Sequence, residues 1–324
     1  MEASDLVMVF FTVVSQMAVG AFLVLGFVQL FLGRGRTPET VERVVRPILY
    51  VIGPVLVVGL IVSMFHMHDV THMFNVILNW QSSWLSREIV FGCLFAGFGF
   101  LFAVLEWFGK GGYVLRQVLA AVAALFGVGL VVSQWMIYYS LTAVPAWNSW
   151  AVPFQFCVTT VLLGCASVAT GLMITHLVRM RGAGNASEAK AGIGARIAEI
   201  NAPSTEEEWK LTGSVLKVTA LVGALAGVAV LVAYPVYVGQ LSQGNSASVA
   251  AAGVFSGSLL GWRLILTGVS VVVLGFFVYT TAGQATLARA KTLVLFVIIA
   301  FVFALGGEFL GRMLHYAAMI KAGM

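Results

Sequence analysis

The chain has 324 residues, of which 60% are hydrophobic and 10% charged, and its mean hydropathy is +0.99. A soluble domain carries about 25% charged residues, so this composition excludes a soluble protein and indicates a polytopic membrane protein. The net charge of +5 does not indicate a nucleic-acid partner, because the basic residues lie in short loops between apolar spans. Cys93, Cys157 and Cys165 lie inside apolar spans without CxxC spacing, so we expect neither disulfides nor a metal site.

Eight stretches are long and apolar enough to cross a bilayer as α-helices, which takes about 20 residues each. They are 7–32, 48–68, 86–108, 115–138, 152–178, 213–238, 259–281 and 291–316. The first stretch follows acidic Glu2 and Asp5 and lacks the cleavage site of a signal peptide, so we expect this helix to be retained. The sequence therefore predicts an all-α fold, with one eight-helix transmembrane domain over residues 1–324 and a cytoplasmic linker at about 179–212.

Arginine and lysine are distributed unequally between the loops, and short cytoplasmic loops are enriched in them. The basic residues gather in 33–47, 109–116, 179–212 and the turn before the last span. The loops on the opposite side, together with both terminal tails, offer only Lys321. We therefore expect both termini to be extracytoplasmic.

Ionisable side chains inside the spans collect in the outer half of the predicted bundle. A charge at the centre of a membrane helix costs roughly 2.5–3.5 kcal/mol, so such groups are usually paired and functional. In EFLGRMLH of the last span, Glu308, Arg312 and His315 form one helical stripe that must face the bundle. A structural alternative is an internal Glu308–Arg312 ion pair. Arg87 and Arg263 open the third and seventh spans, where either can snorkel to the surface.

Glu88 begins the third span beside Arg87, which points about 100° away on a helix. The carboxyl of Glu88 therefore needs a partner from another helix. We expect either a role for Glu88 in a binding site or a structural pair with Arg87 or Arg263.

The nearby segment FHMHDVTH contains His66, His68 and His72. The HxH spacing places the first two rings about 200° apart, so one of them faces the bundle. His176, at the cytoplasmic end of the fifth span, is interpreted as a snorkelling end residue. An interfacial aromatic belt, with a ligand platform as the alternative, accounts for Trp80, Trp84, Trp147 and Trp150.

A cluster of carboxylate, imidazole and guanidinium groups at the outer leaflet suits a small amphipathic molecule that exchanges protons. A quinol releases two electrons and two protons, so its site needs a proton acceptor and an apolar cleft. The electrons pass either to another protein or to a haem, whose axial ligands would be His66 or His68 with His315. A b-type cytochrome subunit is therefore one alternative function. A proton-coupled secondary transporter is another, although the cluster lies near one surface and no sequence repeat is visible.

Four segments resemble the membrane-anchor subunit of dimethyl sulfoxide reductases, the DmsC-like family. They are SMFHMHDVTHMFN at 63–75, SWLSREI at 83–89, VPAWNSW at 144–150 and GGEFLGRMLHY at 306–316. The resemblance implies a haem-free anchor of eight helices in the inner membrane of a bacterium or archaeon. It also implies that electrons pass to an iron–sulfur subunit with 4Fe–4S clusters, and then to a molybdopterin catalytic subunit on the outer face.

The resemblance further implies that His66 and Glu88 belong to a menaquinol site. We expect the other outer-half charges to line the same site, namely Arg87, Arg263, Glu308, Arg312 and His315. Menaquinol is then a bound substrate, and no covalent cofactor is expected. The terminal electron acceptor stays open, because the anchor does not touch it.

The distribution of basic residues makes a prediction about topology. A reporter that is active in the cytoplasm, fused after Met324, should stay silent, because an even number of spans returns the polypeptide to the outer side. A strong cytoplasmic signal would mean that the span count or the orientation is wrong.

Overall fold

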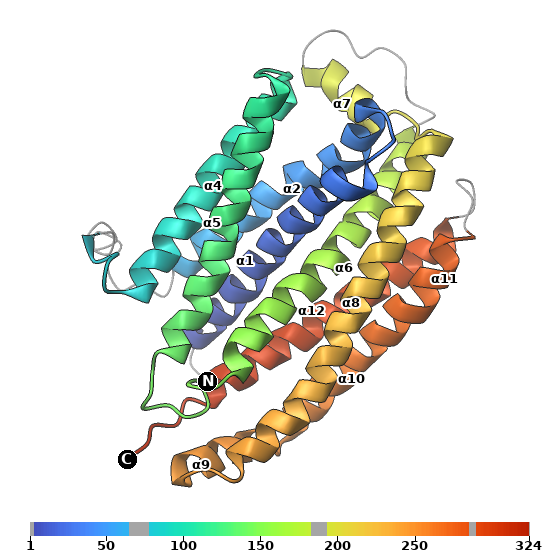
Figure 1. The fold of residues 1–324 in the computed structure, drawn as a ribbon. Coiled ribbons are helices and arrows are strands. Elements are labelled where there is room, and N and C mark those ends of the chain that lie inside the picture. The colour runs from blue at the N-terminus through green and yellow to red at the C-terminus, as the bar shows by residue number, and fades with distance from the viewer. Residues whose placement is uncertain (1–2, 65–77, 183–192, 285–289, 324) are drawn as a thin grey trace.

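The computed structural model describes residues 3–64, 78–182, 193–284 and 290–323, and every regular element in those ranges is a helix. Eight helical spans in the described ranges are long and apolar enough to cross a membrane, which confirms the predicted all-α fold (Figure 1). Six of them are α2 (Pro38–Met64), α4 (Trp84–Phe108), α5 (Tyr113–Tyr139), α6 (Ala151–Gly182), α8 (Glu206–Leu241) and α12 (Lys291–Ala317).

The other two spans contain π-helical turns, which occur mostly as short insertions within α-helices. α1 (Ala3–Phe27) continues as η1 (Val28–Leu32), and α10 (Ser258–Val272) continues through η3 (Val273–Val278) into α11 (Tyr279–Ala282). Two short helices, α7 (Ile193–Asn201) and α9 (Ser246–Val254), lie at opposite ends of the bundle (Figure 1).

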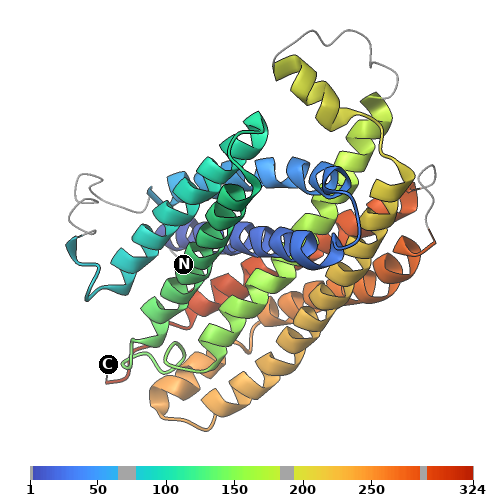
Figure 2. The ribbon, with the colours of Figure 1, turned by 45° about the horizontal axis from the view of Figure 1, so that its top comes forward.

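Helices α1 and α6 form the centre of the bundle. In each of them 67% of the most apolar window is buried, compared with 22% in α4 and 28% in α5. Figure 2 shows α4 and α5 on one side of α1 and the α10–α11 span on the other. The start of α1 and the end of α12 lie at the same end of the bundle, opposite α7 (Figure 1).

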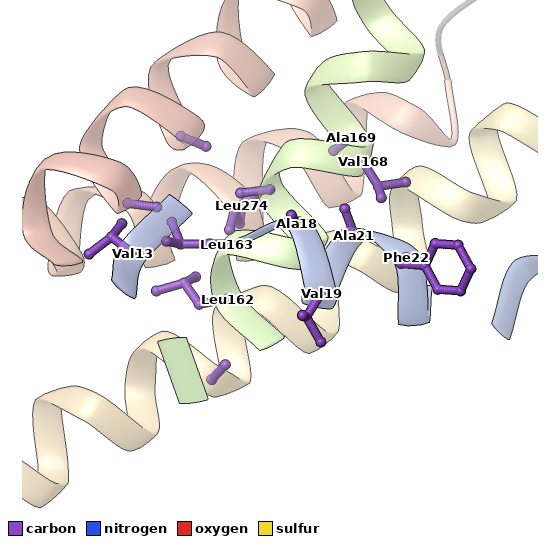
Figure 3. Packing of buried hydrophobic residues seen from close by; sticks show 14 of the residues in the cluster. Val13, Ala18, Val19, Ala21, Phe22, Leu162, Leu163, Val168, Ala169 and Leu274 are labelled. Atoms are coloured by element: carbon purple, nitrogen blue, oxygen red, sulfur yellow. The ribbon is translucent and has the colours of Figure 1, made fainter. Parts of the chain in front are cut away.

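The crossing of α1 and α6 depends on two glycines. A Cβ atom on Gly20 would overlap the carbonyl oxygen of Thr160, and a Cβ atom on Gly164 would overlap the backbone of Gly20. Small residues allow membrane helices to approach closely, and van der Waals packing then holds them together. Figure 3 shows the surrounding core, in which Ala18, Val19, Ala21 and Phe22 of α1 lie near Leu162 and Leu163 of α6 and Leu274 of η3.

Ion pairs join the helices at the end of the bundle that carries α7. Two glutamates there each bind two arginines from other helices. Glu208 accepts from Arg43 at 2.6 Å and Arg179 at 3.2 Å, and Glu106 accepts from Arg46 at 2.8 Å and Arg116 at 2.7 Å. These pairs tie α2 to α4, α6 and α8, so this end of the bundle is held by charge as well as by packing.

The same ion pairs explain where the helices depart from the predicted spans. α2 begins at Pro38 instead of residue 48, and α8 begins at Glu206 instead of 213. Charged turns can stay helical beyond the apolar run when their side chains have partners, and a capping box between Thr205 and Glu208 fixes the start of α8. The segment expected as a linker, 179–212, therefore includes the end of α6, the short helix α7 and the start of α8.

The interpretation of His176 as a snorkelling residue is wrong. Its side chain is buried, and its ring centroid lies 4.6 Å from that of Trp209 in α8. The sequence places His176 near the end of an apolar run. The extra turns of α8 cover it, because that helix begins before its apolar stretch.

The close crossing of α1 and α6 predicts that Gly20→Ala lowers stability by about 1–3 kcal/mol or more, because the added methyl group meets backbone atoms that cannot turn aside. The measurement is the thermal unfolding midpoint of the purified protein in detergent. Gly26→Ala on the same helix is the matched control, since a Cβ there meets no atom within 4 Å. Equal midpoints for the two variants would show that the crossing tolerates separation.

Candidate functional site

Glu88 lies inside the bundle at the end opposite α7. Ser83 caps α4 by accepting a hydrogen bond from the backbone N–H of Ser86, and this start places Glu88 in the second helical turn. The Glu88 side chain is 3% exposed. Its hydrogen-bonding partner among the described residues is the side chain of Gln134 in α5. A buried carboxyl group therefore has a neutral partner from another helix.

Arg87 turns away from Glu88 towards the surface. Its guanidinium lies 4.0 Å from the centroid of the Trp84 ring and donates to the carbonyl oxygens of Trp80 at 2.9 Å and Gln81 at 2.5 Å. A structural ion pair between Arg87 and Glu88 is therefore not formed. Arg87 instead fastens the loop before α4 to the first turn of that helix.

Amide side chains connect Gln134 to the centre of the bundle. Gln134 donates to the hydroxyl of Ser15 at 2.7 Å and accepts from Gln16 at 3.0 Å. Gln16 in turn accepts a hydrogen bond of 3.0 Å from Arg312 in α12. The guanidinium of Arg312 also lies 3.6 Å from the centroid of the Phe156 ring. One series of contacts thus leads from Glu88 through α5 and α1 to α12.

Glu308 and Arg312 have separate partners, so the internal ion pair considered as the structural alternative is wrong. Glu308 accepts a hydrogen bond of 2.5 Å from Thr159 in α6 and pairs with Arg263 of α10 at 3.6 Å. The spacing of Glu308 and Arg312 places both on one face of α12. Each residue nevertheless meets a different neighbouring helix.

Arg263 points into the bundle and does not snorkel. It is 1% exposed, and its guanidinium lies 3.9 Å from the centroid of the Tyr234 ring. Gly311 makes room for it, because a Cβ at that position would overlap the guanidinium. Arg263 pairs with Glu308, so the alternative of an Arg263–Glu88 pair is not what the structure contains.

Aromatic rings enclose His315. Its ring stacks on Trp147 with centroids 5.3 Å apart and meets the edge of Tyr138 at 4.7 Å. The indole of Trp147 donates to the His315 carbonyl oxygen at 2.8 Å, and the hydroxyls of Tyr138 and Tyr316 lie 2.6 Å apart. Trp147 is therefore part of the buried cluster, whereas Trp80 and Trp150 are exposed as an interfacial belt requires.

The predicted site residues fall into three groups. Glu88, Arg312 and His315 lie in one buried layer, with electrostatic contact between Glu88 and both Tyr138 and Tyr316. Glu308 and Arg263 form an adjoining buried pair, and Arg87 lies outside the layer. His66 lies outside the described residues, as do His68 and His72.

Sequence reasoning missed the neutral members of this layer, notably Gln16, Gln134 and Thr159. A search restricted to ionisable side chains overlooks amides and hydroxyls, although such groups also require partners in lipid. One signal was available: the tetrapeptide VVSQ occurs at 13–16 and again at 131–134. The structure places these two Ser-Gln pairs against each other.

Comparison with known proteins yields one family match along most of the sequence. The family model described as "DMSO reductase anchor subunit (DmsC)" matches residues 1–318.

Curated relatives match over part of the sequence, and each is a component of an anaerobic dimethyl sulfoxide reductase. The relative from Haemophilus influenzae is 34% identical over 178 residues, which cover 54% of this protein and 61% of the relative. In Escherichia coli K12, YnfH is 30% identical over 160 residues, covering 48% and 54%, and a second such component is 30% identical over 157 residues, covering 48% and 53%. The matched segment thus spans between about half and three fifths of each relative.

The Arg263–Glu308 pair predicts strong coupling between the two residues. Glu308→Gln leaves a buried guanidinium without its counter-charge, which should cost about 3–5 kcal/mol of stability. Adding Arg263→Gln should restore part of that loss, as measured by membrane yield and by the unfolding midpoint in detergent. Arg87→Gln is the control for removing an exposed charge and should have little effect. Strictly additive losses in the double variant would contradict direct pairing.

Proposed function

The chain belongs to the DMSO reductase anchor subunit family, and on that premise we propose that it is the menaquinol-oxidising membrane anchor of a molybdopterin oxidoreductase complex. Its partners are an iron–sulfur electron-transfer subunit and a molybdopterin catalytic subunit. Both partners dock on the outer face of the bacterial or archaeal inner membrane, next to the end of the bundle that contains Glu88. The anchor supplies the quinol site and no centre for the terminal acceptor.

The observation that carries this proposal is the environment of Glu88. Its carboxyl is buried at one end of the bundle and has the amide of Gln134 as its hydrogen-bonding partner among the described residues. A carboxylate bound to an arginine must give up an ion pair to take a proton, whereas a carboxylate bound to an amide does not. Glu88 is therefore suited to accept a proton from a quinol hydroxyl.

The proposed reaction converts the quinol to a quinone with the release of two protons and two electrons. Glu88 accepts one proton, and His66 accepts the other. The electrons leave to the iron–sulfur subunit, since they need an acceptor outside this protein. Gln134 holds the Glu88 carboxyl in place, and Gln16 and Arg312 fix Gln134 in turn.

The surroundings of His315 favour this haem-free function over the cytochrome alternative. A haem ligand needs open space beside a ring nitrogen, on the side where the iron and porphyrin lie. The imidazole of His315 has Trp147 on one face and Tyr138 and Phe156 at its edges. A visible spectrum of the purified complex tests the choice, because a Soret band stoichiometric with this subunit would establish the cytochrome function.

The sharpest prediction concerns Glu88→Gln. The amide keeps the shape of the side chain but cannot accept a proton, so quinol oxidation should fall by roughly 10²-fold or more, the usual scale for loss of a general base. The measurement is menaquinol-driven turnover by the assembled complex in proteoliposomes. His66→Ala should give a similar defect, and the double variant should lose much less than the product of the two effects.

An artificial reductant that feeds the iron–sulfur subunit directly serves as the control. Turnover with that reductant should be normal in both single variants, which separates a quinol defect from a failure of assembly. Intact quinol-driven turnover in an assembled Glu88→Gln complex would mean that Glu88 is structural.

A further inference from the structure

An apolar cavity of about 530 Å³ lies between α2 and α4, with Phe22 of α1 at its base. Its size falls within the range of small-molecule sites. The residues that flank it include Gly53 and Pro54 on α2 and Gly99 and Ala103 on α4. These small side chains face a space that they do not fill: a Cβ atom on Gly53 or Gly99 would meet no atom within 4 Å.

The cavity exists because α2 and α4 are held together beyond both of its ends. At the end towards α7, Arg46 and Glu106 form an ion pair of 2.8 Å, and the rings of Tyr50 and Trp107 meet edge to face at 5.1 Å. At the other end, Leu60 of α2 packs over Gly92 of α4. Protein interiors rarely leave a void of this size unfilled, so an apolar molecule is expected to occupy it.

The cavity lies along the same face of α4 as the candidate quinol site. Glu88, Phe95 and Phe102 are seven residues apart in turn, and all three are buried on the bundle side of α4. At 1.5 Å of rise per residue, Gly99 lies about 16 Å along the helix from Glu88. A bicyclic quinol head cannot cover that distance. A molecule that reaches both places must carry a long apolar tail.

We propose that this cavity binds the polyprenyl tail of the quinol whose head group lies at Glu88, an inference that rests on the function proposed above. The two ends of the cavity differ in a way that favours this occupant. An acyl tail of a phospholipid would enter from the membrane surface nearest α7, where the Arg46–Glu106 pair and the Tyr50–Trp107 contact close the way. At the Glu88 end the boundary is one apolar side chain over a glycine, which suits a tail continuing from a head group there.

Filling the cavity tests the proposal. Gly99→Leu and Gly53→Leu each place a side chain into the empty space without displacing protein atoms. Gly97→Leu is the matched control, because this glycine of α4 is exposed, has equally open space and does not flank the cavity. Each complex is assayed in proteoliposomes with tailed menaquinol and with a soluble naphthoquinol that lacks a tail.

The expected result is a KM for tailed menaquinol that rises roughly tenfold in the Gly99 and Gly53 variants, the scale of losing contact with a few methylene groups. The KM for the tail-less quinol should be unchanged, and Gly97→Leu should match the wild type with both quinols. Quinone extracted from the purified complex should fall in the same two variants. Two independent cavity variants keep the test decisive if one of them fails to assemble.

Three outcomes would overturn the proposal: unchanged kinetics in both cavity variants, equal losses with the two quinols, or loss of bound phospholipid with normal oxidation of tailed menaquinol. None of them bears on the role of Glu88. A failure of the proposed function is distinguishable, because Glu88→Gln would then oxidise both quinols at the wild-type rate.

Discussion

A polar side chain inside the hydrocarbon layer has no water to bind, so its partners must come from the protein itself. The polar groups of this protein accordingly lie in two layers near opposite ends of the bundle. The layer near α7 contains Glu106 and Glu208 with four arginines, and the opposite layer contains Glu88, Glu308, Arg263, Arg312 and His315. Between the layers the helices depend on close apolar packing, as at Gly20 and Gly164.

The two layers differ in what their carboxylates contact. Glu106 and Glu208 each bind two arginines, so protonation of either would leave buried guanidinium groups without a counter-charge. Glu88 instead has an amide as its described partner. One end of the bundle is therefore built for stability. The other end contains a carboxyl group that can change its charge at a lower cost, as proton-transfer chemistry requires.

Helix α4 connects these features. It carries Glu88 near one end and Glu106 near the other, and the apolar cavity lies along the face between them. It is also the least enclosed of the eight described spans, with 22% of its most apolar window buried. A helix that faces lipid over most of its surface is well placed to receive a substrate that is dissolved in the membrane.

The sequence by itself determined the eight spans and the stripe of Glu308, Arg312 and His315. The length of an apolar run and the period of a helix are local properties of a polypeptide. It also indicated the family, because the motifs around Glu88 and Glu308 are continuous segments.

Only the tertiary structure decided which partner each polar side chain meets. Glu308 pairs with Arg263 and not with Arg312, and His176 and Trp147 are covered by neighbouring elements. Helical spacing states which residues share a face, but the packing of the helices determines what that face touches. For the same reason, the contact between the two Ser-Gln pairs of α1 and α5 and the cavity between α2 and α4 follow from the assembled bundle and from no single span.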